Sequence, residues 1–169
     1  GKIVLDKLKN FFPEEPKLLF ASYCNEEHPF PVHSDYYHKR IGTPYFAILL
    51  PISVDNSTSN MHLSKTIIFN QQDTYVDESV HDNRTYTRDN FKKTHNKVLE
   101  GNSSWLHDED LSHCEKEDLE RLTIAKIVPW AYGNAIYWDE KMLHCSNNFH
   151  KKGIKSKQHI IIHTYIEEK

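Results

Sequence analysis

The chain has 169 residues, of which 38% are hydrophobic and 27% are charged, and its formal net charge is −3. This composition is typical of a folded, soluble domain and excludes a disordered chain. A near-neutral charge gives no general attraction to nucleic acid or to an anionic membrane, so neither is expected as a partner. The sequence shows no apolar run as long as a membrane span and no secretory signal. We therefore expect one cytoplasmic domain over residues 1–169.

The predicted elements begin with a helix and continue mainly with strands. Apolar residues recur at helical spacing over 2–12, and Pro13 follows as a stop. Short runs rich in β-branched and aromatic residues then predict strands, at 17–24, 44–54, 65–71, 122–130, 134–139 and 158–166. We expect 122–130 and 134–139 to pair with each other, because only a short segment with Tyr132-Gly133 separates them.

Two polar segments interrupt the strands. Residues 72–104 are dense in Asp, Asn, Thr, Arg and Lys, and we interpret them as an insert or lid over the barrel. Residues 105–121 carry leucines that can share one helical face, which predicts a helix. Mostly antiparallel strands with one or two flanking helices predict a mainly β fold, either a barrel or a jelly roll.

A histidine and an aspartate lie two residues apart in His33-Ser34-Asp35. Residues i and i+2 of a strand point to the same side, so both side chains can reach one ion. Two histidines and one carboxylate form the facial triad that binds non-haem Fe(II). His144 follows the predicted strand 134–139 after a short turn and supplies a second histidine. Because the chain has twelve histidines, a lone H-x-D match would be weak.

A cluster of lysines precedes the last predicted strand. It comprises Lys151, Lys152, Lys155 and Lys157. A basic side chain at the start of that strand is suited to pairing with the carboxylate of a buried ligand.

These features together resemble the Fe(II)/2-oxoglutarate-dependent oxygenases, the superfamily of phytanoyl-CoA and prolyl hydroxylases. The resemblance extends over about residues 30–166 and rests on His33-Ser34-Asp35, on the strand from Gly133 to Asp139 with Leu143-His144, and on the lysine before the last strand. It implies a double-stranded β-helix, which is a jelly-roll or cupin-like barrel. It also implies Fe(II) as cofactor, held by His33, Asp35 and His144, with 2-oxoglutarate and O2 as cosubstrates.

The same resemblance implies a basic residue that holds the far carboxylate of 2-oxoglutarate. Lys155 and Lys157 both have suitable spacing, and we favour Lys157 because it directly precedes the last strand. Tyr45, or Tyr23 on the earlier strand, is a candidate second contact. The chain before His33 is short for the family, and 72–104 matches no known family feature, so the substrate stays undefined.

The implied activity is hydroxylation of a C–H bond of a small molecule or a peptidyl side chain, with release of succinate and CO2. The carboxylate of Asp35 favours hydroxylation over halogenation, because the halogenases of this family lack that ligand. One alternative is a cupin-like metal-binding barrel without oxygenase activity, such as an isomerase or a sugar-binding module. Another is a structural zinc domain built from some of His107, His113, Cys114, His144 and Cys145.

Overall fold

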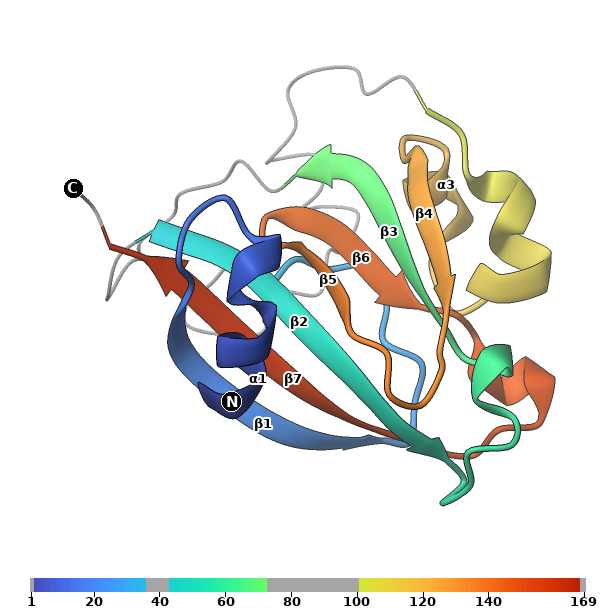
Figure 1. The fold of residues 1–169 in the computed structure, drawn as a ribbon. Coiled ribbons are helices and arrows are strands. Elements are labelled where there is room, and N and C mark those ends of the chain that lie inside the picture. Colours follow the sequence, from blue (N-terminus) through green and yellow to red (C-terminus); the bar gives the residue numbers. More distant parts are fainter. Residues whose placement is uncertain (1, 36–42, 73–100, 168–169) are drawn as a thin grey trace.

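The computed structural model describes residues 2–35, 43–72 and 101–167, and it is mainly β (Figure 1). Helix α1 (Lys2–Leu8) continues into a 3₁₀ turn at Lys9–Phe11, so the predicted N-terminal helix is confirmed. The strands in these ranges are β1 (Lys17–Glu26), β2 (Thr43–Val54), β3 (Lys65–Gln72), β4 (Ile124–Pro129), β5 (Ile136–Asp139), β6 (Met142–Ser146) and β7 (Lys157–Ile166).

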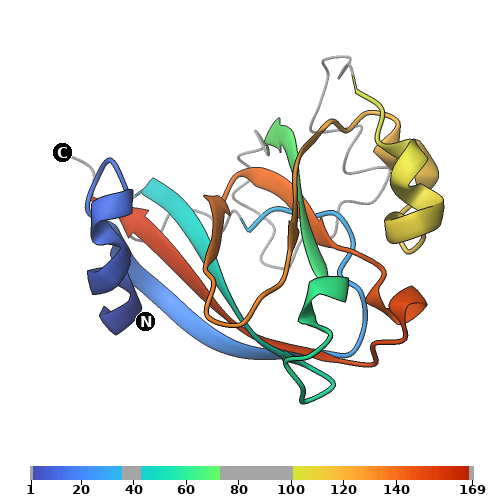
Figure 2. The same ribbon diagram turned by 45° about the vertical axis from the view of Figure 1, so that its right-hand side comes forward.

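The strands form two antiparallel sheets. The four-stranded sheet has the order β1-β7-β2-β5, and the three-stranded sheet has the order β4-β3-β6. The sheets face each other, with α1 outside the four-stranded sheet and short helical turns outside the three-stranded one (Figure 2). Between the described strands, no pairing joins the two sheets into a closed barrel. The mainly β prediction is confirmed at this level.

The alternation of side chains along the strands separates the interior from the α1 face. On β2, Ala47 and Leu49 point between the sheets and pack with Trp130, whereas Ile48 points outward to Leu5 of α1. Adjacent residues of a strand face opposite sides, so a continuous apolar run fills both layers. Both faces of the four-stranded sheet are therefore covered.

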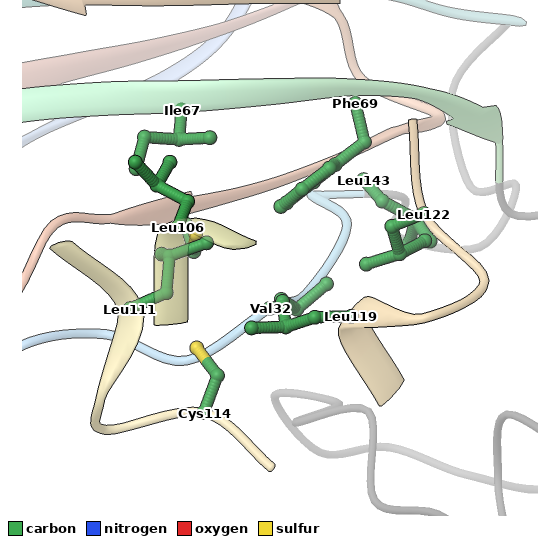
Figure 3. Close-up of a cluster of buried hydrophobic side chains, with 10 residues drawn as sticks. Val32, Ile67, Phe69, Leu106, Leu111, Cys114, Leu119, Leu122 and Leu143 are labelled. Atoms are coloured by element: carbon green, nitrogen blue, oxygen red, sulfur yellow. The ribbon is translucent and has the colours of Figure 1, made fainter. Parts of the chain in front are cut away.

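The outer face of the three-stranded sheet packs on the helical turns through a further group of buried apolar side chains, the outer apolar cluster (Figure 3). Val32 and Leu143 belong to this cluster, as does Cys145. Leu143 and Cys145 flank His144 on β6, and their burial outside the sheet directs His144 toward the space between the sheets.

The predicted pairing of 122–130 with 134–139 is wrong. β4 pairs with β3, whereas β5 pairs with β2 in the other sheet. The intervening segment crosses between the sheets, and buried Trp130 fixes its start through an Nε1–H hydrogen bond to Thr66 of 3.0 Å. Gly133 adopts a φ of +83°, which suits glycine in such a turn.

The helical character predicted for 105–121 is confirmed in part, because the segment forms separate short turns and not a continuous helix. The chain forms a 3₁₀ turn (Ser104–Leu106), a π-helical turn (His107–Leu111) and the short helix α3 (Lys116–Leu119). Asp110 in the second turn is buried and lies 2.6 Å from the Lys65 ammonium, which ties the turn to β3. The leucines of this segment are nevertheless buried together in the outer apolar cluster, as the predicted apolar face requires.

None of the helices in the described part of the chain is long and apolar enough to cross a membrane. Most of the predicted lid at 72–104 lies outside the described residues, as do Tyr36 and Tyr37 next to the H-x-D motif.

Candidate metal centre

His33 and Asp35 reach β6 through the backbone. The His33 N–H donates to the His144 carbonyl at 2.9 Å, and the His144 N–H donates to the His33 carbonyl at 2.8 Å. The Asp35 N–H donates to the Glu140 carbonyl at 3.1 Å. The H-x-D segment therefore meets the edge of β6 through an isolated bridge and not as part of a full strand. His144 lies within β6, whereas the sequence placed it after a strand.

The structure brings the three predicted ligands together. One potential ligand atom from each of His33, Asp35 and His144 lies within 4.8 Å of the other two. Asp35 Oδ2 is 3.3 Å from His144 Nε2, and Asp35 Oδ1 is 3.8 Å from His33 Nε2. All three side chains are largely buried, with exposed fractions of 6–16%.

Hydrogen bonds to the backbone set the protonation of both imidazoles. His33 Nδ1 is 2.8 Å from the Pro31 carbonyl oxygen, and His144 Nδ1 is 3.1 Å from the Met142 carbonyl oxygen. A carbonyl oxygen only accepts, so each Nδ1 carries the proton and each Nε2 keeps a free lone pair. The two Nε2 atoms therefore face the Asp35 carboxylate, whose buried Oδ2 has no hydrogen-bond partner. Lone pairs that converge in this way fit a divalent cation.

Burial keeps both histidines neutral. Burial and, to a smaller extent, the neighbouring His144 together lower the pKa of His33 to about 4, although Asp35 opposes the shift. Burial likewise lowers the pKa of His144 to about 4, against the hydrogen bond to Met142. A neutral imidazole can bind a metal without first losing a proton, so both rings are ready for metal binding at pH 7.

Glu140 contacts both the segment that holds Asp35 and a histidine of the four-stranded sheet. Glu140 accepts the Asp35 N–H through its carbonyl, and its side chain lies 3.0 Å from His163 Nδ1 of β7. Burial raises the pKa of Glu140, although His163 opposes the shift. From β5, the Trp138 ring packs 4.6 Å from the His144 ring. The four-stranded sheet therefore contributes a side chain that packs directly on the ligand His144.

Lys157 begins β7 and is almost completely buried, with an exposed fraction of 3%. Its Nζ atom is 2.7 Å from Glu26 Oε2 and 4.4 Å from the Trp130 ring centroid. His159 Nε2 is 3.5 Å from the other Glu26 oxygen. Lys157 also contributes to lowering the pKa of His144, which places its charge within electrostatic reach of the metal ligands.

The other predicted cosubstrate contacts lie away from this interior. The Lys155 side chain is exposed, and its backbone N–H donates to Asp55. Tyr45 packs against Phe12 on the α1 face, and its hydroxyl accepts the Glu14 N–H. Tyr23 also points outward, with an exposed fraction of 65%.

Sequence reasoning missed Glu26. It follows Cys24 by two residues on β1. Glu26 pairs with Lys157 of β7, and Cys24 pairs with His159. The strand period could have placed Glu26 on the same face as Cys24, but only the β1–β7 register shows that it lies beside Lys157.

Two residues of the alternative zinc site, Cys114 and Cys145, lie close together. Cys114 and Cys145 share the outer apolar cluster, and a hydrogen bond between their side chains is the main cause that lowers the pKa of Cys114 to about 5. Across the three described ranges, His33, Asp35 and His144 form the only group of three or more side chains that could hold a metal ion.

No family model, curated protein or solved structure matches this chain.

Proposed function

We propose that this chain is a non-haem Fe(II)- and 2-oxoglutarate-dependent dioxygenase. Its reaction would hydroxylate a C–H bond of a small molecule or peptidyl side chain while 2-oxoglutarate and O2 are converted to succinate and CO2. Bound Fe(II) would supply the oxygen activation that this reaction needs. The protein's contribution would be to hold the ligands, exclude water and orient the reactants.

The observation that carries the proposal is the convergence of His33, Asp35 and His144. Two histidines and one carboxylate are the donor set of non-haem Fe(II) oxygenases, and the Nδ1–carbonyl hydrogen bonds leave both Nε2 atoms free to bind. The segments that carry these residues are far apart in the sequence, and backbone hydrogen bonds hold them side by side.

The order of the strands supports a double-stranded β-helix. If the His33 bridge is taken as a short strand beside β6, each sheet has four positions. Along the chain, β1, β2, β5 and β7 lie in one sheet, whereas the His33 bridge, β3, β4 and β6 lie in the other. Eight positions in two facing antiparallel sheets are the arrangement of a jelly roll.

Lys157 is the residue that we propose to hold the far carboxylate of 2-oxoglutarate. Its ammonium already binds a carboxylate, that of Glu26, at 2.7 Å, so the position accepts this chemical group. Two aromatic rings, those of Trp130 and Phe149, lie 4.4 and 5.4 Å from its Nζ atom and fix the cation.

The same pair also favours a second candidate function. Because Glu26 neutralises Lys157, the positive charge of this lysine is balanced without a bound dicarboxylate. A cupin-like metal-binding barrel that does not use 2-oxoglutarate would need no more than the three ligands.

The test measures metal binding and succinate formation separately. We expect anaerobically purified protein to bind Mn(II) and, with Fe(II), 2-oxoglutarate and O2, to form succinate slowly even without its prime substrate. His33→Ala should weaken Mn(II) binding and reduce succinate formation, each by more than about 100-fold, because a direct ligand matters at least as much as its supporting residues. His62→Ala, which changes an exposed histidine, is the matched control and should behave like the wild type.

Succinate formation that survives in His33→Ala would contradict the proposal. Mn(II) binding that depends on His33, without any succinate and without 2-oxoglutarate binding, would instead favour the second candidate.

A further inference from the structure

Lys157 is not an open anchor, because Glu26 of the same chain already occupies it. Glu26 Oε2 lies 2.7 Å from the ammonium, and Oε1 lies 3.5 Å from His159 Nε2. These contacts join β1 to β7 at a position where the two strands pair, with Glu26 opposite Lys157. A carboxylate that arrives at Lys157 therefore meets a carboxylate already in place.

Charge decides what this position can accept. Burial by itself would raise the pKa of Glu26, but Lys157 and, to a smaller extent, His159 hold it below its ordinary value. Glu26 is therefore ionised at pH 7 and balances the charge of Lys157. A second carboxylate beside this pair would add a net negative charge to a buried region, which is costly while Glu26 stays in place.

The two partners differ in their freedom to move. Lys157 is enclosed, with an exposed side-chain fraction of 3%, whereas that of Glu26 is 22%. Glu26 is also the last residue of β1, the edge strand of its sheet. Its side chain has a route to solvent that the lysine lacks. If Glu26 turned outward, the buried ammonium would be left without a counter-ion.

We propose that Glu26 is the residue that sets how strongly this site prefers a dicarboxylate, by holding Lys157 until the far carboxylate of the 2-oxoacid replaces it. This inference rests on the proposed function. The observed affinity for 2-oxoglutarate is then the difference between two carboxylates competing for one ammonium. A 2-oxoacid that lacks the far carboxylate leaves the Glu26–Lys157 pair intact and does not compete.

The experiment compares two ligands that differ only at that end. 2-Oxoglutarate and 2-oxovalerate are titrated by calorimetry into anaerobic Mn(II)-loaded protein. Glu26→Gln should bind 2-oxoglutarate at least about tenfold more tightly than the wild type, because close buried charge pairs couple strongly. Its affinity for 2-oxovalerate should change by less than about twofold, since that ligand does not meet the removed charge. Glu27→Gln, which changes the exposed neighbouring acid, is the control and should match the wild type.

Unchanged or weaker 2-oxoglutarate binding in Glu26→Gln overturns the inference and leaves the proposed function standing. If Mn(II) binds but neither 2-oxoacid binds to any variant, the proposed function fails and the inference fails with it. If Glu26→Gln does not fold, Glu26→Asp keeps the charge but shortens its reach by one methylene, and 2-oxoglutarate should again bind more tightly. The wild type alone gives a further check, because a preference for 2-oxoglutarate over 2-oxovalerate above about 100-fold would contradict competition by Glu26.

Discussion

Two polar clusters between the sheets differ in whether a cation of the protein faces the carboxylate. At His33, Asp35 and His144, lone pairs converge and the buried Asp35 Oδ2 has no hydrogen-bond partner. At Lys157 and Glu26, a cation and an anion meet at 2.7 Å and balance each other. Among the described residues, Lys157 supplies the counter-charge of Glu26, whereas Asp35 faces two neutral imidazoles and no cation.

This difference assigns different roles to the two clusters. Two free imidazole lone pairs beside a carboxylate are suited to a cation that the protein does not supply. Removing one partner of a buried ion pair destabilises the fold, because the other charge is left uncompensated, and the pair can bind an outside group only by exchange. Three variants test the difference, in order from the largest expected effect to the smallest.

Breaking the balanced pair should cost the most stability. Lys157→Met leaves the Glu26 carboxylate without its partner, and we expect the free energy of unfolding to fall by about 2 kcal/mol, discounted for the partial exposure of Glu26. Adding Glu26→Gln should restore at least half of the loss. Urea unfolding monitored by circular dichroism measures both changes. Lys155→Met, at an exposed position two residues earlier, should stay within about 0.5 kcal/mol of the wild type. An equal loss in both lysine variants would refute the pairing.

Replacing the Asp35 carboxylate by an amide should instead raise the free energy of unfolding. Asp35→Asn supplies an amide N–H that can donate to the free Nε2 of His144, which lies 3.3 Å from Asp35 Oδ2. In chelator-treated protein we expect unfolding to become less favourable by about 1 kcal/mol, because a buried acceptor gains a donor. Added Mn(II) should stabilise the wild type and not this variant. The exposed helical Asp6→Asn is the control. A destabilised Asp35→Asn protein would show that the carboxylate serves the fold and not an ion.

The smallest effect concerns His159 and pH. Burial lowers its pKa to about 4, and nearby Glu26 only partly offsets this, whereas the unfolded chain titrates near its ordinary value of about 6.5. From about pH 6.5 down to 4 the unfolded state binds a proton that the folded state lacks, so acid lowers stability in that window.

His159→Gln stays neutral at every pH and should lose less stability than the wild type between pH 7 and pH 6, by about 0.7 kcal/mol. Urea unfolding at the two pH values measures this, and exposed His62→Gln is the matched control. A pH dependence identical to that of the wild type would mean that the pKa of His159 is the same in the folded and unfolded states.

The local parts of the fold followed from the sequence. The first helix, the mainly β character and most strand positions agree with the predicted ranges, because these patterns arise within a few neighbouring residues. Which strands pair with each other could not be predicted from the sequence. The strands at 122–130 and 134–139 are neighbours in the sequence yet belong to different sheets, because each pairs with a strand far away in the chain.

For the candidate site, the sequence by itself supplied the donor types and their spacing: the His33–Asp35 pair, one distant histidine and a lysine before the last strand. Only the tertiary structure decided which atoms meet. It placed His33 beside His144 through backbone pairing, turned Tyr45 to the α1 face, and set Glu26 against Lys157. The physical reason is that side-chain chemistry is encoded residue by residue, whereas strand register and charge pairing depend on segments that meet only after the chain has folded.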